Sequence, residues 1–129
     1  MVGQSHRVQI RHVVVANKEI AITILDIVET AKTHSKKTKA LIKLAEKYSL
    51  CGSKNDGGNL GWLELASDDP RKIEYQPVFK NTELEKIVRE SIYHKKLHKN
   101  KVFGPVKTLQ GFHIIMIGNE FGELLHETF

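Results

Sequence analysis

Arg11-His12-Val13-Val14-Val15 is one of two related stretches; the other, near the opposite end of the chain, is Gly104-Pro105-Val106-Lys107-Thr108-Leu109-Gln110-Gly111-Phe112-His113-Ile114-Ile115. Each stretch sets one histidine beside a run of β-branched aliphatic residues. That composition is typical of a buried strand. The two stretches therefore predict two core strands, each of which carries a single imidazole.

The spacing of apolar and turn-forming residues predicts the elements around these strands. We expect a strand over 8–15, a helix capped by Asn17 that ends near 33–37, a second helix through 41–48, a loop over 51–59 and a short strand over 60–65. An irregular segment then leads to a helix capped by Thr82, with Lys95 and Lys96 near its end. A hairpin of strands over 103–108 and 112–117 follows, and the tail over 118–129 is expected to form a short helix.

The length and composition suit one compact domain. The chain has 129 residues, of which 40% are hydrophobic and 27% charged. No apolar run is long enough to span a bilayer, and the polar N-terminal stretch does not resemble a secretory signal. Cys51 is the only cysteine, which excludes an intramolecular disulfide and fits a reducing compartment. We expect a cytoplasmic protein of the α+β class, or one domain of a longer chain.

The chain is basic, with a net charge of +5 and a sequence pI near 9.3. Part of this charge is concentrated at and beyond the end of the predicted third helix, in Lys95, Lys96, Lys99 and Lys101. Such a cluster can bind a nucleic-acid backbone weakly. A solvated surface that keeps the protein in solution explains the same residues, and both interpretations stay open.

A third stretch, Leu44-Ala45-Glu46-Lys47-Tyr48-Ser49-Leu50-Cys51 followed by Gly57-Gly58-Asn59-Leu60-Gly61-Trp62, completes a pattern with the two histidine stretches. In this order the three resemble the parvulin-type peptidyl-prolyl cis–trans isomerases, the rotamases. The resemblance covers about 8–117 and is weakest between 67 and 101. It implies one domain over 1–129, with its core at about 8–117 and a tail over 118–129, and a four-stranded, mainly antiparallel sheet flanked by helices.

The resemblance also implies that the first and last strands are neighbours, so that the two histidines meet on one sheet face. The family's catalytic positions fall on His12, Cys51, Thr108 and His113. The positions that would bind the substrate are Leu60, Leu63, Val88, Gln110 and Phe112. The implied reaction is noncovalent rotation about X–Pro bonds, which needs no cofactor and no metal.

Other chemistries have weaker support in the residues. A lone Cys51 beside histidines would suit a thiol nucleophile or, with more ligands, zinc, but the chain has no paired cysteines. Gly57-Gly58-Asn59-Leu60-Gly61 lacks the ending of a phosphate-binding loop. Histidines in apolar strands are also often hydrogen-bonded core residues.

The sequence departs from the family where the helix after the second strand normally supplies methionine and phenylalanine. Here that helix carries Ile87, Val88 and Ile92. A weakly active or inactive peptide-binding chaperone, or a basic adaptor for nucleic acid or ribosomes, is therefore the alternative to an active isomerase. The loop after the first strand holds only Lys18 as a cation, so we expect no preference for phosphorylated substrates. We expect a monomer.

Overall fold

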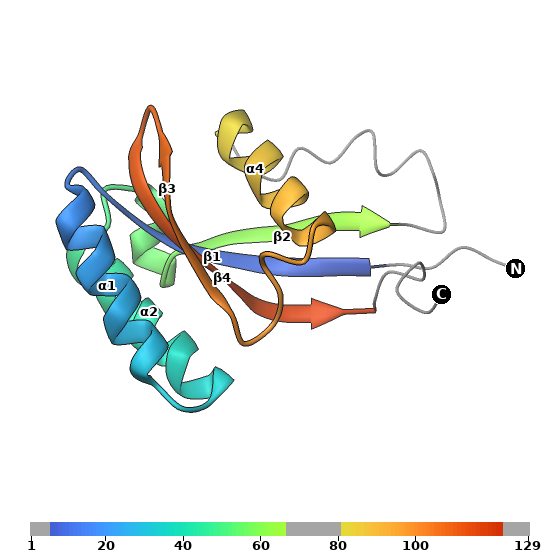
Figure 1. Ribbon diagram of the computed structural model, residues 1–129, viewed down its shortest axis with the longest axis horizontal. Helices are drawn as coiled ribbons and strands as arrows, with labels where there is room; N and C mark the ends of the chain where they lie inside the picture. The colour runs from blue at the N-terminus through green and yellow to red at the C-terminus, as the bar shows by residue number, and fades with distance from the viewer. Residues whose placement is uncertain (1–5, 67–80, 123–129) are drawn as a thin grey trace, which may run out of the picture.

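The computed structural model describes residues 6–66 and 81–122 (Figure 1). In chain order the elements are β1 (His6–Val15), α1 (Lys18–Thr30), α2 (His34–Tyr48), the short 3₁₀ helix η1 (Gly52–Asp56), β2 (Asn59–Ala66), α4 (Thr82–Tyr93), β3 (Val102–Thr108) and β4 (Gly111–Phe121). The described residues form three α-helices and a four-stranded antiparallel sheet, which confirms the α+β class that the sequence predicts.

The strands of the sheet follow the order β2-β1-β4-β3, and every neighbouring pair is antiparallel. The first and last strands of the chain therefore form the central pair, as predicted. In this pair His12 lies opposite Ile115, and Val14 lies opposite His113. Because side chains alternate between the two faces of a strand, His12 and His113 are diagonal neighbours on one face.

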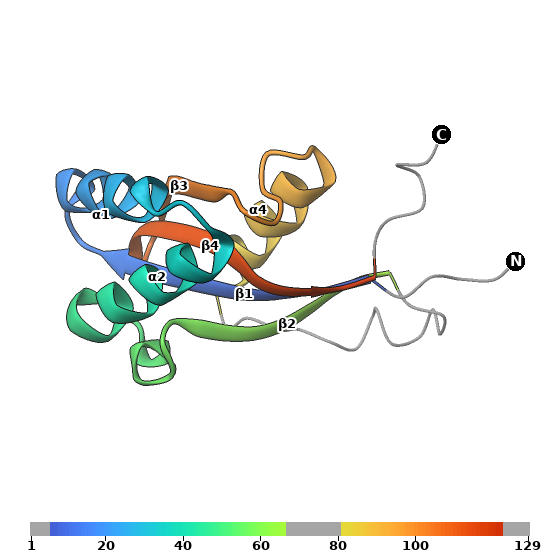
Figure 2. The ribbon, with the colours of Figure 1, turned by 90° about the horizontal axis from the view of Figure 1, so that it is seen from below.

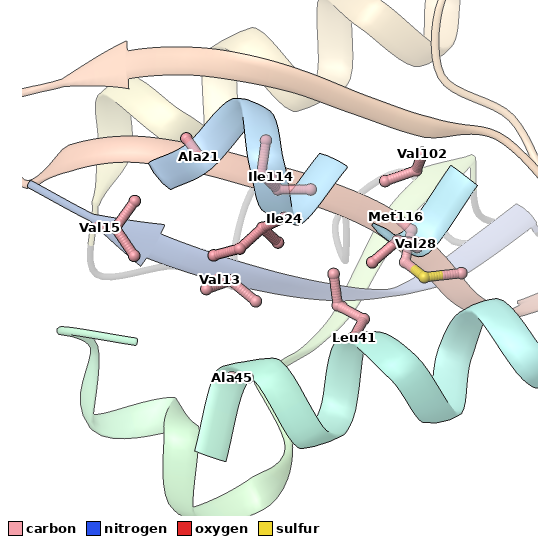
Figure 3. Close-up of a cluster of buried hydrophobic side chains, with 10 residues drawn as sticks. All are labelled: Val13, Val15, Ala21, Ile24, Val28, Leu41, Ala45, Val102, Ile114 and Met116. Carbon is pink, nitrogen blue, oxygen red and sulfur yellow. The ribbon is translucent and has the colours of Figure 1, made fainter. Parts of the chain in front are cut away.

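Helices cover both faces of the sheet. The two ribbon views show α1 and α2 side by side on one face and α4 on the other (Figures 1 and 2). The helix pair covers one buried cluster (Figure 3), which consists of Val13, Val15, Ala21, Ile24, Val28, Leu41, Ala45, Val102, Ile114 and Met116. A second cluster lies beneath α4 and takes Ile115 and Ile117 from the opposite face of β4. Because helices cover both faces of the sheet, the central strands carry apolar side chains on both faces.

Side-chain caps set where the helices begin. Asn17 accepts hydrogen bonds from the N–H groups of Glu19 and Ile20 and caps α1, as predicted. The third helix differs from the prediction by one residue. Asn81, not Thr82, is its N-cap, since the Asn81 side chain accepts the N–H of Leu84 at 3.0 Å.

Other predicted boundaries shift as well. Helix α4 ends at Tyr93, so Lys95 and Lys96 lie beyond its last turn. Strand β4 continues to Phe121, so residues 118–121 are not helical, and the rest of the expected terminal helix, over 123–129, lies outside the described residues. The irregular segment predicted over 67–80 lies outside them too. No helix in the described ranges is long and apolar enough to cross a membrane.

Gly58 joins η1 to the centre of the sheet. The N–H of His12 donates to the Gly58 carbonyl at 3.0 Å, and Gly58 has a φ of +79°. A Cβ atom at this position would lie 2.2 Å from the His12 carbonyl oxygen. Glycine is therefore required here both by the backbone conformation and by the close approach.

We predict that Gly58→Ala lowers the free energy of unfolding by at least about 2 kcal/mol, because a side chain forces β1 and η1 apart. Urea denaturation measures this loss. Gly52→Ala is the matched control, since no heavy atom lies within 4 Å of its added Cβ, and it should change the stability by less than about 0.5 kcal/mol. Equal losses in the two variants would contradict the packing described here.

Candidate active site

A cleft of about 880 Å³ opens on the α4 face of the sheet. It lies between η1, the start of β2, the start of α4 and the β3–β4 turn. Apolar side chains of Leu60 and Leu84 form part of its wall, and polar groups of Cys51, Gln110 and other residues interrupt that wall. The remaining lining residues are His12, Gly52, Ser53, Asn59, Asn81, Thr82, Glu83 and Leu109.

His12 and His113, called the histidine pair below, meet beneath this cleft. Their Nδ1 atoms are 2.9 Å apart, and the rings stack with centroids 5.1 Å apart and an interplanar angle of 21°. The exposed fractions are 1% for His12 and 0% for His113. Burial lowers the pKa of both imidazoles from 6.5 to about 4, and the neighbouring His12 contributes to the lowering at His113. The pair is therefore neutral at physiological pH.

The hydrogen bonds around Thr108 fix where the protons of the pair lie. Thr108 Oγ1 accepts the N–H of Gln110 at 3.1 Å and an amide hydrogen of Asn81 at 3.2 Å. Both lone pairs of the hydroxyl are then occupied, so its hydrogen donates to His113 Nε2 at 2.7 Å. His113 consequently carries its proton on Nδ1 and donates it to His12 Nδ1.

This arrangement leaves the proton of His12 on Nε2, because a neutral imidazole carries one. His12 Nε2 is buried and has no hydrogen-bond partner in the described part of the chain. Since His12 also lines the cleft, the pair presents one unused N–H donor at that side. A buried donor without a partner is costly, which points to a role in binding.

Cys51 is held in the wall of the cleft by the segment that follows α2. Ser49 Oγ accepts the N–H of Val14 at 3.1 Å and that of Cys51 at 3.4 Å, and the N–H of Leu50 donates to the Val14 carbonyl at 2.8 Å. The Cys51 sulfur accepts the N–H of Ser53 at 3.5 Å and caps η1. These bonds attach the wall of the cleft to β1.

Comparison with protein families agrees with this geometry. The model of the rotamase family, the PPIC-type peptidyl-prolyl isomerase domain, matches residues 12–119. The chain belongs to the PPIC-type, or parvulin, isomerase family. Comparison with curated protein sequences finds no match.

Several solved structures share the fold. A structure of the SurA-like chaperones PEB4 and Cj1289 of Campylobacter jejuni is 26% identical, with a TM-score of 0.65 over 95% of this chain and 43% of that chain. PrsA of Bacillus subtilis is 24% identical, with a TM-score of 0.58 over 88% of this chain and 35% of that one. The parvulin domain of PpiD from E. coli is 18% identical, with a TM-score of 0.59 over 92% of each chain. The protein thus spans less than half the length of the first two.

The structure brings most of the predicted site residues together. His12, Cys51, Leu60 and Gln110 line the cleft of this parvulin domain. His113 and Thr108 lie directly beneath them, joined to His12 by the hydrogen bonds described above. Their roles in catalysis stay predictions.

Three predicted substrate-binding residues lie elsewhere. Leu63 and Val88 are completely buried in the cluster beneath α4 and do not line the cleft. Phe112 packs with the cluster on the α1 and α2 face, because it alternates with His113 along β4 and so points away from the cleft. The prediction that Phe112 binds substrate is therefore corrected.

Sequence reasoning missed the cleft residues at the start of α4, namely Asn81, Glu83 and Leu84. Asparagine before a helix is a strong capping signal and could have identified Asn81, but Thr82 is a capping residue too. Leu84 is the first apolar residue after that cap and forms part of the cleft wall. Among the described residues no group of three or more histidine, cysteine or acidic side chains could hold a metal ion.

The lowered pKa values predict how stability depends on pH. In the unfolded chain the pair titrates near 6.5, and in the folded protein near 4, so only the unfolded state takes up protons between these values. The stabilisation is complete above pH 6.5 and is lost as the pH falls toward 4, with a slope of up to about 1.4 kcal/mol per pH unit for each histidine.

Urea denaturation between pH 7 and 4.5, combined with NMR titration of the imidazole C–H signals, measures this effect. The His12 and His113 signals should not shift until the pH is well below 5. Titration of either signal near pH 6.5 would contradict a neutral buried pair.

Proposed function

We propose that the domain accelerates cis–trans isomerisation of X–Pro bonds in unfolded or flexible chains, without a covalent intermediate. The single observation that carries the proposal is the position of the neutral histidine pair beneath a cleft with an apolar wall. Rotation about the peptide bond crosses a barrier of roughly 18–20 kcal/mol. Every reduction of about 1.4 kcal/mol raises the rate tenfold, so modest stabilisation of the twisted amide is sufficient.

The cleft offers what a twisting prolyl bond requires. In this proposal the partly buried Leu60, backed by the buried Leu84, packs against the proline ring, and the buried, unpartnered N–H of His12 Nε2 bonds the carbonyl oxygen of the rotating bond. Twisting ends the amide resonance, so the carbonyl oxygen loses negative charge; the donor therefore serves to hold this oxygen in its rotated position, and the apolar wall favours the less polar twisted amide. Aliphatic walls give less contact area than aromatic ones, so we expect a moderate rate.

A covalent mechanism through Cys51 has no support in the geometry. A thiol nucleophile needs a base within hydrogen-bond reach. Within the described ranges the partner of the Cys51 sulfur is the N–H of Ser53, while the Nδ1 atoms of the histidine pair bond each other. We infer that Cys51 positions the wall of the cleft by capping η1.

The charges around the cleft favour unphosphorylated substrates. Glu83 is an acidic lining residue, and none of the lining residues in the described ranges 6–66 and 81–122 is lysine or arginine. A dianionic phosphate would meet repulsion without the charged donors it normally requires. Over residues 16–18, where β1 ends and α1 begins, Lys18 is the only cation.

In a broader form of this proposal, the domain is part of a peptide-binding chaperone. PEB4 and Cj1289 of Campylobacter jejuni are SurA-like chaperones, and the present chain corresponds to 43% of the matched chain. An X–Pro isomerase domain in such an assembly would act on unfolded clients. The cytoplasmic location and the monomeric state stay predictions from the sequence.

We predict that the wild type accelerates isomerisation of a short Ala–Pro peptide more than that of the phosphoserine–Pro equivalent, as measured by exchange NMR.

Cys51→Asp should retain several-fold more activity than Cys51→Ala. Aspartate can still accept the Ser53 N–H and cap η1, whereas alanine cannot. Loss of the cap should lower the free energy of unfolding by about 0.5–2 kcal/mol.

Thermal unfolding of both variants serves as the control for loss of fold. Absence of activity in the folded wild type would refute the proposal. A folded but inactive Cys51→Asp, together with a covalent adduct on wild-type Cys51 during turnover, would replace it with a covalent mechanism.

A second candidate function rests on the loop between α4 and β3. Leu97 is completely buried, and the N–H groups of Lys96 and Leu97 both donate to the Ser91 carbonyl, so the loop is anchored. Lys95, Lys96, His98 and Lys101 line a second hollow, the lysine groove, together with Leu25, Glu29, Val102, Phe103 and Gly104. We propose that this groove and Lys99 bind nucleic-acid phosphates weakly and without sequence preference.

We predict that replacing Lys95, Lys96, Lys99 and Lys101 by glutamine abolishes binding to duplex RNA while isomerase activity changes less than twofold. Wild-type affinity should fall steeply with salt, by a log–log slope of about −0.7 to −0.9 for each phosphate contacted. Fluorescence anisotropy at several salt concentrations measures both properties. The matched control replaces four exposed lysines of α2, Lys36, Lys39, Lys43 and Lys47, and should keep the binding. Equal binding by both variants would refute the assignment to this groove.

A further inference from the structure

We propose that Asn81 is a positioning residue that determines which nitrogen of His12 carries the proton at the cleft. Asn81 is the N-cap of α4, and it also contacts Thr108 beneath the cleft. The part of this proposal that concerns catalysis rests on the proposed isomerase function. The part that concerns proton positions does not.

Helix capping fixes the orientation of the Asn81 amide. Its Oδ1 accepts the backbone N–H of Leu84 at 3.0 Å, which only an oxygen can do. The NH₂ group is therefore directed to the other side, where it is 3.2 Å from Thr108 Oγ1 and 3.4 Å from Gln110 Oε1. A flipped amide would set its NH₂ against the Leu84 N–H and its oxygen against Gln110 Oε1. All three contacts agree on one orientation.

This orientation determines the direction of the hydrogen bonds that follow. With the Asn81 amide and the Gln110 N–H on its lone pairs, the Thr108 hydroxyl has only its hydrogen left to give to His113 Nε2. His113 then donates from Nδ1 to His12, and His12 keeps its proton on Nε2. Three successive hydrogen bonds thus connect the helix cap with the donor at the cleft.

The direction matters because a carbonyl oxygen in the cleft can only accept. With the proton on His12 Nε2, the pair offers it a donor. With every bond reversed, His12 Nε2 would present a lone pair and repel the same oxygen. The pair is uncharged in both arrangements, so they differ only in which nitrogens carry the protons.

Asn81→Asp tests the proposal with little change in shape. Aspartate caps a helix as well as asparagine does, but an ionised carboxylate has no hydrogen to give. The Thr108 hydroxyl should then donate to residue 81, so His113 Nε2 becomes protonated. Long-range ¹H–¹⁵N NMR of the imidazoles should show the exchange of protonated and unprotonated nitrogens in His113. We expect kcat/KM for an Ala–Pro peptide to fall at least tenfold.

Two further variants complete the experiment. Asn17→Asp makes the same substitution at the N-cap of α1, where Asn17 bonds Glu19 and Ile20, and should preserve both the nitrogen shifts and the activity. Asn81→Ser keeps a capping oxygen but removes the amide donor. It releases the Thr108 hydroxyl, so the nitrogen shifts should move toward a mixture of the two states.

Wild-type nitrogen shifts in folded Asn81→Asp and Asn81→Ser would overturn the role of Asn81. Reversed protons with kcat/KM within twofold of the wild type would overturn the need for a donor at His12 Nε2. A wild type without isomerase activity would instead refute the proposed function, while the nitrogen shifts would still decide whether Asn81 sets the proton positions.

Discussion

Antiparallel pairing of β1 with β4 positions everything else in this molecule, because it joins strands from opposite ends of the chain at the centre of the sheet. Its register places His12 and His113 on the α4 face and Ile114 and Met116 on the α1 and α2 face. A slip of one residue would exchange these faces and bury a histidine among the aliphatic side chains of Figure 3. Packing of the core therefore enforces the geometry of the site.

The same pairing explains how two imidazoles can be buried beneath an open cleft. A charged imidazole there would have to leave water, and a neutral one must find hydrogen-bond partners. The pair meets this requirement by sharing one hydrogen between its Nδ1 atoms and by accepting the Thr108 hydroxyl at the far end. One nitrogen, His12 Nε2, is left without a partner among the described residues. Ser53 Oγ, another buried group of the cleft lining, is likewise without a partner among the described residues, so both unsatisfied groups belong to the cleft.

Much of the fold follows from local sequence pattern. Aliphatic runs predict β1 and β4, and Asn17 marks the start of α1. Local pattern contains no information on which strands pair, so the meeting of His12 with His113 was predicted only through the resemblance to parvulins.

The candidate site was predicted less completely than the fold, for three physical reasons. Apolar residues of core and cleft wall look alike in a sequence, so Leu63 and Val88 were not distinguished from Leu84. Phe112 was misplaced although strand alternation against His113 already separates their faces. Asn81 and Thr82 are adjacent capping residues, and the three-dimensional contact with Thr108 distinguishes them.

The central claim is that His12 and His113 form a neutral pair joined through one shared hydrogen. The most direct test is the scalar coupling between the two Nδ1 nuclei across that hydrogen bond, measured by NMR on the ¹⁵N-labelled wild type at pH 7. The account predicts a resolved coupling between these nitrogens and a ring proton that exchanges slowly with water. Absence of the coupling, with both imidazole protons in rapid exchange with solvent, would contradict it.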